Sequence, residues 1–164
     1  MPSDPEARRQ LAQAVLYEAG VHRSKGEFDQ AIAAFSRALE LDPSSFSGYN
    51  NRGLTFLELG AWDDAIADFG EAIRLQPDRA FLYTNRANAY QKKDDLESAI
   101  LDYTHALEID PKYAPAFFNR GNCFFQAEMY QKAIDDYDRA LKLNKKYKEA
   151  ANNKRLAEEK LKGN

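Results

Sequence analysis

The sequence is poor in the residue types that build catalytic and metal-binding centres. Its 164 residues include one cysteine, Cys123, and two histidines, His22 and His105. One cysteine cannot form an internal disulfide, and histidines this far apart in the chain make no metal-binding pair. A lone histidine is more often structural or solvated, and a small thiol beside Phe124 is more often buried than reactive. We therefore expect no enzyme, no metal and no cofactor.

Long apolar runs and an excess of positive charge are also absent. No stretch of about 18 apolar residues occurs, and residues 1–6 have neither the basic nor the apolar region of a signal peptide. A net charge of −3 gives no basic field that would attract nucleic acid. We expect a cytoplasmic protein whose partner is neither a membrane, nor a nucleic acid, nor a small-molecule substrate.

The carboxyl-terminal end departs from this charge balance. Residues 144–164 hold seven Lys or Arg against three Glu. A basic end could contact nucleic acid or anionic lipid, but here acids alternate with bases and no obvious aromatic stacking platform accompanies them. A solvated cap is the favoured interpretation.

Paired acidic residues recur in the chain and could suggest acid–base chemistry. The pairs are Asp63–Asp64, Asp94–Asp95 and Asp135–Asp136. Each falls at or soon after the expected start of a helix, where negative charge complements the helix dipole. We expect them to stabilise helices and to have no catalytic role.

What the sequence does contain is a repeat of 34 residues. Four alanines keep this interval, and so do four aromatic residues, namely Ala31, Ala65, Ala99 and Ala133 with Phe35, Phe69, Tyr103 and Tyr137. Within one copy, Ala31, Phe35 and Ala38 follow the i, i+4, i+7 spacing of one helix face. A fixed period of this length is typical of a helical solenoid.

Each copy predicts two helices joined by a short break. A small residue at Gly53, Ala87 or Gly121 stands on the first helix, where it lets the two helices approach. The breaks are Lys25–Gly26–Glu27, Leu59–Gly60–Ala61 and Lys93–Asp94–Asp95. Prolines end the second helices at 43, 77 and 111, whereas Lys145 takes this place in the fourth copy.

This pattern resembles the tetratricopeptide-repeat (TPR) family. The resemblance implies an all-α fold, a right-handed α-solenoid of four helical hairpins plus a capping helix. Asp4–Pro5 predicts an N-cap followed by proline in the first turn. The expected segments are an N-terminal extension of the first helix at 1–11, repeats at 12–45, 46–79, 80–113 and 114–147, and a capping helix and tail at 148–164.

In this family the first helix of each repeat lines a concave groove, which would be the peptide-binding site here. Asn51, Asn85 and Asn119 recur at one phase and resemble the asparagine ladder of O-linked N-acetylglucosamine transferases. An asparagine side chain both donates and accepts, so the row could bind a peptide backbone, or it could bond within the array. The other expected groove residues are Asn50, Asn88, Asn122, Phe81, Phe118, Phe125, Gln91, Lys92 and Gln126.

Three asparagines alone cannot account for micromolar binding. At roughly 0.5–1.5 kcal/mol each they supply less than the about 8 kcal/mol that such affinity represents. Phe81, Phe118 and Phe125 are the expected apolar anchors, unless one or two of them pack against an adjacent repeat.

The family's carboxylate clamp, which holds acidic chaperone tails, fits poorly. Each of two frames matches one of five clamp positions, Asn51 in the first and Asn85 in the second. The arginines at 52, 86 and 120 stand one place beyond the asparagines and are expected to pair with acids of neighbouring helices. We expect a scaffold or adaptor that binds an extended or short helical segment of a protein partner. The alternatives are an array that stacks into a homo-oligomer and a co-chaperone-type adaptor without a standard clamp.

Overall fold

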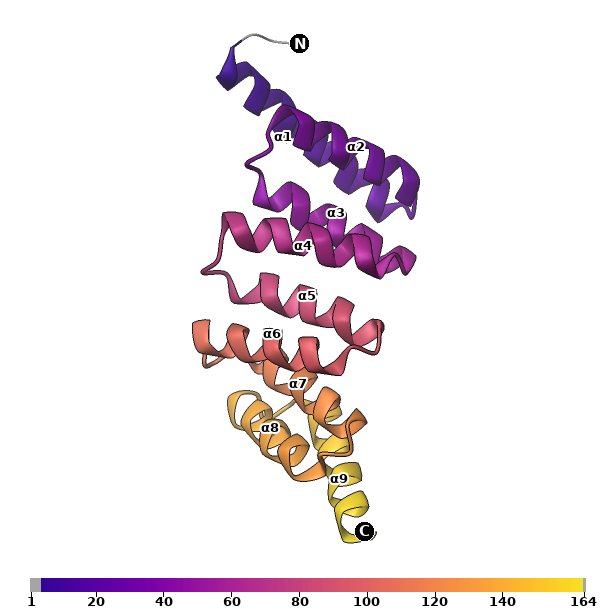
Figure 1. Ribbon diagram of the computed structural model, residues 1–164, viewed down its shortest axis with the longest axis vertical. Coiled ribbons are helices and arrows are strands. Elements are labelled where there is room, and N and C mark those ends of the chain that lie inside the picture. Colours follow the sequence, from indigo (N-terminus) through magenta and orange to yellow (C-terminus); the bar gives the residue numbers. More distant parts are fainter. Residues whose placement is uncertain (1–3, 164) are drawn as a thin grey trace. The chain divides into compact units, whose positions relative to one another are not determined.

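The structure, a computed structural model, describes residues 4–163. Residues 1–3 and 164, the outer ends of the expected N-terminal extension and tail, lie outside this part. Between residues 4 and 163 the chain forms helices and no strand, which confirms the all-α class (Figure 1). The helices are α1 (Pro5–Ser24), α2 (Phe28–Leu41), α3 (Phe46–Leu59), α4 (Trp62–Leu75), α5 (Ala80–Lys92), α6 (Leu96–Ile109), α7 (Ala114–Gln126), α8 (Tyr130–Leu143) and α9 (Lys148–Gly163).

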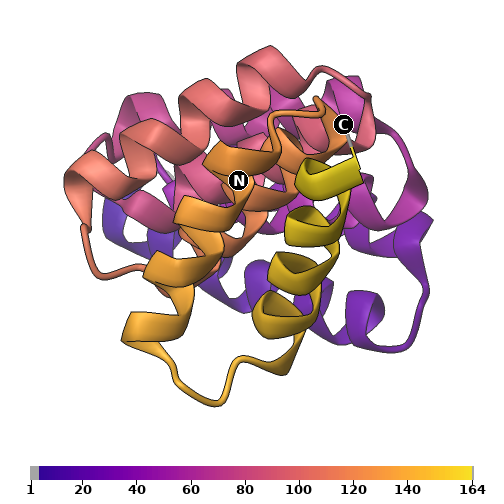
Figure 2. The same ribbon diagram turned by 90° about the horizontal axis from the view of Figure 1, so that it is seen from below.

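The helices belong to two compact units. Unit 1, Met1–Asp78, contains the hairpins α1–α2 and α3–α4. Unit 2, Arg79–Asn164, contains α5–α6 and α7–α8, followed by α9, which packs against α8 and also contacts α7. Figure 2 shows α9 lying beside α8. Each unit has buried apolar clusters of its own.

The start of α1 follows directly from two residues. The Asp4 side chain accepts hydrogen bonds from the backbone N–H groups of Glu6 and Ala7, and Pro5 occupies the first turn. Proline suits this place because its missing N–H would have no partner inside the helix. The predicted N-cap is confirmed.

The second helices all end at the same phase, with or without a following proline. α8 stops at Leu143 although Lys145 replaces the proline. There the Asn144 side chain accepts a hydrogen bond from the N–H of Lys146, as Asp42 does from Ser44 and Asp110 from Lys112. This local turn offers the backbone an alternative to the next helical hydrogen bond. In α2, α6 and α8, an Asp or Asn directly after the helix therefore helps to end it, with or without a following proline.

Within a hairpin, the small residue of the first helix makes room for an aromatic ring. A Cβ atom added at Gly53 would lie 2.9 Å from the Phe69 ring, and one added at Gly121 would lie 2.8 Å from the Tyr137 ring. The four repeated aromatics and the four repeated alanines are all buried. The predicted small residues thus admit a ring from the second helix into the seam.

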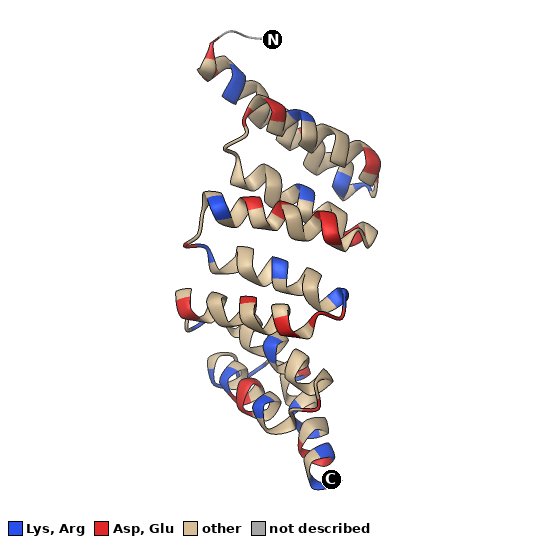
Figure 3. Cartoon of the chain, in the orientation of Figure 1, with Lys and Arg blue, Asp and Glu red and all other residues tan. Residues whose placement is uncertain are grey.

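The last helix, α9, keeps one face of the repeat and replaces the other. Ala150 and Ala157, which stand one period after Ala116 and Cys123, are fully buried against the preceding hairpin. Arg155 and Glu158, by contrast, stand one period after Gly121 and Phe124, where a second helix would pack. Figure 3 shows charges of both signs along α9. A further hairpin packed on this face would have to desolvate these charges, which suits α9 to a capping position.

One acidic pair does not lie where the dipole argument placed it. Asp63 and Asp64 are in the first turn of α4, as expected. Asp136, however, is in the interior of α8, and no acidic residue occupies the first turn of that helix. Asp136 is buried because it pairs with an arginine of α7, as described below.

Candidate functional site

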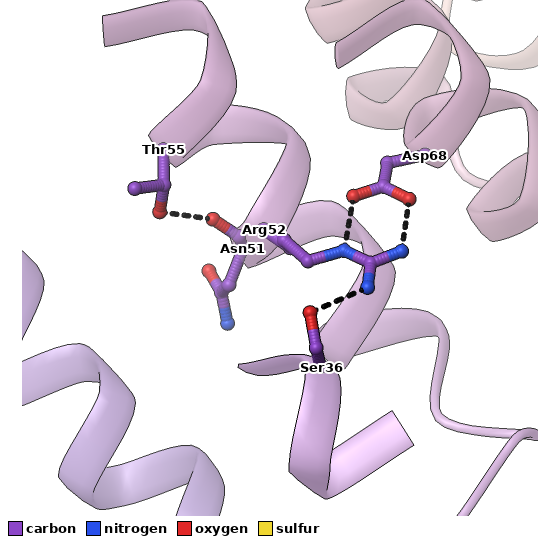
Figure 4. Close-up of polar contacts among 5 residues, drawn as sticks. All are labelled: Ser36, Asn51, Arg52, Thr55 and Asp68. Atoms are coloured by element: carbon purple, nitrogen blue, oxygen red, sulfur yellow. Dashed lines mark hydrogen bonds and ion pairs between the residues drawn. The ribbon is translucent and has the colours of Figure 1, made fainter. Parts of the chain in front are cut away.

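The arginines at 52, 86 and 120 are each hydrogen-bonded to an aspartate on the next helix of their own unit. The Arg52 guanidinium on α3 donates two hydrogen bonds to the Asp68 carboxylate on α4, both 2.7 Å long. Its third nitrogen donates to Ser36 on α2 at 2.8 Å, so the side chain joins α2, α3 and α4 (Figure 4). A bidentate pair of this kind is strong and geometrically specific.

The same arrangement recurs in unit 2. Arg86 donates two hydrogen bonds to Asp102, and Arg120 donates two to Asp136 and one to Thr104. The hydrogen bond to Asp102 raises the pKa of Arg86 above its ordinary value. The predicted pairing of these arginines with acids is confirmed, and their charge is neutralised inside the fold.

Asn51, the first member of the asparagine row, lies in unit 1. Its backbone carbonyl accepts a hydrogen bond from the Thr55 hydroxyl, and Figure 4 shows its side chain away from the Arg52 guanidinium. In the first repeat the corresponding residue is Tyr17, whose side chain is 78% exposed. The row of amides therefore begins at the second repeat.

In unit 2 the asparagines join a hydrogen-bonded network. The Tyr103 hydroxyl on α6 donates to Oδ1 of Asn88 on α5 at 2.5 Å, and Nδ2 of Asn119 on α7 donates to the same oxygen at 3.3 Å. Asn119 is thus bonded within the array through its nitrogen, which is one of the two outcomes considered for the row.

One period later the network repeats with α9 in the role of the next first helix. The Tyr137 hydroxyl on α8 donates to Oδ1 of Asn122 at 2.9 Å, and Nδ2 of Asn153 on α9 donates to the same oxygen at 2.9 Å. Asn153 stands one period after Asn119. The asparagine row therefore extends into the capping helix.

A pocket of about 360 Å³ opens at this second network. It combines amides with an aromatic ring, a phenol and an aliphatic side chain, and none of its lining residues is charged. The lining residues are Gln91 from α5, Asn122, Phe125 and Gln126 from α7, Tyr137 from α8, and Asn153 and Leu156 from α9. A concave, mostly apolar site with a few convergent polar groups is the usual form of a ligand pocket.

The three expected aromatic anchors lie in different surroundings. Phe81 is 37% exposed, and Phe125 lines the pocket with its ring 5.5 Å from that of Tyr130. Phe118 packs its ring 4.7 Å from that of Tyr147 and 6.0 Å from that of Tyr137. Phe118 therefore packs between α7, α8 and the loop that joins α8 to α9.

The remaining expected groove residues are partly engaged. Gln91 donates to Gln126 at 3.2 Å across α5 and α7, and Lys92 is exposed at the end of α5. Asn50 and Asn85 are half-buried, and each has an interaction partner.

Three pocket residues were not expected from the sequence. Asn153 and Leu156 lie in the segment interpreted as a cap, and Tyr137 was counted only as a core aromatic. Extending the period past residue 147 would have placed Asn153 in the row, one interval after Asn119. Nothing in the local sequence marks the exposed Leu156 as a pocket residue.

Burial moves the pKa values of two groups near the pocket further above neutral pH. Desolvation raises the pKa of Tyr137 to about 12 and that of the Cys123 thiol to about 12. The Tyr137 hydroxyl is therefore a hydrogen-bond donor at neutral pH, and Cys123 is a thiol and not a reactive thiolate. Among residues 4–163, no cluster of three or more His, Cys, Asp or Glu could hold a metal ion.

Within the described part of the chain, no helix has the length and apolar character needed to span a bilayer.

Comparison with known proteins identifies the family. A model described as TPR repeat matches residues 21–60 and 53–94, and a model described as tetratricopeptide repeat matches residues 80–113 and 114–150. A search of curated proteins gave no match.

Three solved structures illustrate the likeness. A crystal structure of MamA protein is 25% identical over 91% of this chain and 81% of that chain, with a TM-score of 0.84. The first TPR of Spaghetti (RPAP3), bound to the HSP90 peptide SRMEEVD, is 28% identical over 73% of this chain and 95% of that chain, with a TM-score of 0.70. A tetratricopeptide repeat protein from Parabacteroides merdae, 23% identical over 93% of this chain and 59% of that chain, shares the fold with a TM-score of 0.81. These structures confirm the α-solenoid class, and the chain belongs to the tetratricopeptide-repeat family, whose members are typically scaffolds for protein interaction.

Proposed function

We propose that this chain is an interaction module that binds an uncharged, extended segment of a partner protein on the face formed by α5, α7 and α9. The observation that carries the proposal is the pocket between these helices, where amides and apolar side chains converge and no charged side chain is present. An extended peptide offers backbone N–H and C=O groups to the amides and a side chain to the apolar wall.

The apolar part of the pocket supplies what hydrogen bonds alone cannot. Phe125 and Leu156 line it from α7 and α9, and Leu156 is 43% exposed. Covering an exposed leucine contributes about 25 cal/mol per Å² of apolar area removed from water. An apolar side chain of the partner is therefore the expected anchor.

A solved TPR structure supports peptide binding by this type of module. The similar RPAP3 domain is bound to the HSP90 peptide SRMEEVD, which contains two glutamates and ends in aspartate. The carboxylate clamp uses five residues from three successive repeats. When α9 is counted as the first helix of a third repeat after 80–113 and 114–147, the two asparagines of the clamp are present as Asn88 and Asn119. The three positions that require a cation hold Thr84, Glu149 and Asn153. We expect the preferred peptide to be neutral.

The alternative of end-to-end stacking receives no support at the α9 end. Arg155 and Glu158 occupy the positions through which another hairpin would pack, and burying them in a second copy would cost desolvation energy. Sedimentation at several concentrations tests this alternative, and a monomer at all of them would oppose it.

Fluorescence anisotropy with a library of labelled peptides tests the proposed function. The site variant is Asn153→Ala with Leu156→Ala, and the matched control is Asn152→Ala with Leu161→Ala. Both pairs are on α9, both leucines are 43% exposed, and only the first pair lines the pocket. We expect the site variant to weaken binding by about tenfold or more, corresponding to about 1.4 kcal/mol, and the control to bind as wild type does. Equal binding by both variants would contradict this location of the site.

A further inference from the structure

Each repeat of unit 2 contains a tyrosine–asparagine pair that the repeats of unit 1 lack. The aromatic residue of the second helix is Phe35 or Phe69 in unit 1 but Tyr103 or Tyr137 in unit 2. The residue that faces it on the first helix changes in parallel, from Gly20 and Leu54 to Asn88 and Asn122. Each tyrosine hydroxyl donates to the asparagine of its own repeat.

The hydroxyl anchors the asparagine side chain, and Asn153 completes the network. Oδ1 of Asn122 accepts two hydrogen bonds, one from the Tyr137 hydroxyl and one from Nδ2 of Asn153, each 2.9 Å long. Because a phenol hydroxyl can also accept, an amide flipped by half a turn could still bond Tyr137, but it would present an N–H group to the Asn153 donor and lose that bond. In the orientation that keeps both bonds, the Asn122 nitrogen points away from Tyr137.

The two asparagines then present one donor and one acceptor side by side. Nδ2 of Asn122 and Oδ1 of Asn153 have no hydrogen-bond partner among residues 4–163, and both residues line the pocket. Each residue of an extended peptide likewise carries one N–H and one C=O. The two asparagines can therefore bind the N–H and C=O groups of a peptide whatever its side chains are.

We propose that Tyr137 is a positioning residue, which orients Asn122 and Asn153 so that together they bind the main chain of an extended peptide. The proposal rests on the proposed function and deepens it, because it assigns the binding of the main chain to specific atoms. The capping helix, through Asn153, is then part of the recognition site. Tyr103, Asn88 and Asn119 form an equivalent set one repeat earlier.

The test combines two variants with an altered peptide backbone. Tyr137→Phe removes the hydroxyl and keeps the ring in the core. Asn122→Asp keeps an oxygen for Tyr137 and Asn153 but removes the nitrogen donor. The control is Tyr147→Phe, since the Tyr147 ring packs on Phe118 and its hydroxyl has no hydrogen-bond partner in the described part of the chain.

The probe is the tightest-binding neutral peptide from the library, together with analogues in which single backbone amides are replaced by esters. An ester lacks the N–H group, so wild type should bind the analogue at one position about 2- to 10-fold more weakly, the range for one hydrogen bond. Tyr137→Phe and Asn122→Asp should each weaken binding of the unmodified peptide by a similar factor. In Tyr137→Phe the ester should cost less than in wild type, and Tyr147→Phe should behave as wild type.

The outcomes separate the two proposals. If wild type binds no peptide, the proposed function fails. If wild type binds but no ester analogue is weaker, or if Tyr137→Phe retains both the affinity and the full ester effect, the positioning role is wrong. Preference for a peptide with an acidic carboxyl-terminal tail, lost at high salt, would overturn neutral main-chain recognition. Circular dichroism of each variant checks that the fold is intact, and Asn122→Asp tests the role if Tyr137→Phe is destabilised.

Discussion

The buried acids of the second helices are held by arginines, and these pairs stabilise the fold from within. Asp136 is buried while its partner Arg120 is 18% exposed, and the two share hydrogen bonds of 2.8 Å. The spacing of 16 residues between partners is the same in all three arginine–aspartate pairs. Sequence alone predicted that the arginines pair with acids but not which acid each one takes.

Replacing Asp136 with asparagine should therefore destabilise the fold by about 3 kcal/mol, because one partner of a buried pair is left with an uncompensated charge. The asparagine would also present an N–H group to one of the Arg120 donors. Chemical denaturation measures the change in the free energy of unfolding. The control is Asp135→Asn, an exposed neighbour that should change stability by less than about 0.5 kcal/mol. A similar small effect for both variants would contradict the pairing.

The buried phenols of unit 2, Tyr103 and Tyr137, and its buried thiol have pKa values raised by burial and predict a loss of stability in alkaline solution. Burial raises the pKa of Tyr137 from 10.0 to about 12 and that of Cys123 from 9.0 to about 12. The folded chain then holds these protons more tightly than the unfolded chain, so the stabilisation is complete below the unfolded values and is lost as pH rises towards about 12.

Urea denaturation at pH 8, 9.5 and 10.5 measures this loss. We expect the free energy of unfolding to fall across the series, and to fall less steeply in Tyr137→Phe. A free energy that does not change between pH 8 and pH 10.5 would contradict the burial of these groups.

At the level of helices, the 34-residue repeat predicts which positions of each helix pack against an adjacent helix. α9 retains the positions that face the preceding hairpin, Ala150 and Ala157, and lacks those that would face a second helix. The predicted capping role follows from this pattern. The contribution of α9 to the pocket does not, because it depends on where α9 sits against α7 and α8.

Enlarging Ala157 should overpack this contact. Ala157→Leu is expected to cost about 1–3 kcal/mol, since the alanine is fully buried and the surrounding helices must move to admit the larger side chain. Ala151→Leu, on the exposed side of the same helix, is the matched control and should change stability by less than about 0.5 kcal/mol. Thermal and chemical unfolding of the two variants measure the difference, and an equal effect would mean that the register of α9 is wrong.

At the level of the whole molecule, stability is expected to be local to each unit. Unit 1 and unit 2 each have buried clusters of their own. In arrays of this kind a repeat contacts only its neighbours, so a core substitution acts mainly near its own position.

Phe69→Ala should lower the free energy of unfolding by about 3–5 kcal/mol, the cost of truncating a large aromatic side chain in a core. The Phe69 side chain is fully buried in unit 1. Hydrogen exchange should show the loss of protection concentrated in residues 4–78 and smaller in residues 79–163. A loss of stability below about 1 kcal/mol would contradict the assigned repeat register.

The sequence by itself determined the class of this protein. A 34-residue period and its helical spacing fix which side chains lie in a hairpin seam, because burying the apolar face of each helix provides most of the driving force for folding. The tertiary structure decided which side chains meet at the candidate site. It packed Phe118 against Tyr147, hydrogen-bonded Asn119 and Asn153 to asparagines of the preceding repeat, and hydrogen-bonded Asn122 to Tyr137. These outcomes depend on distances between atoms of different helices. A shift of about one ångström can change the partner of an amide hydrogen bond, whereas the hydrophobic pattern of the sequence is insensitive to such a shift.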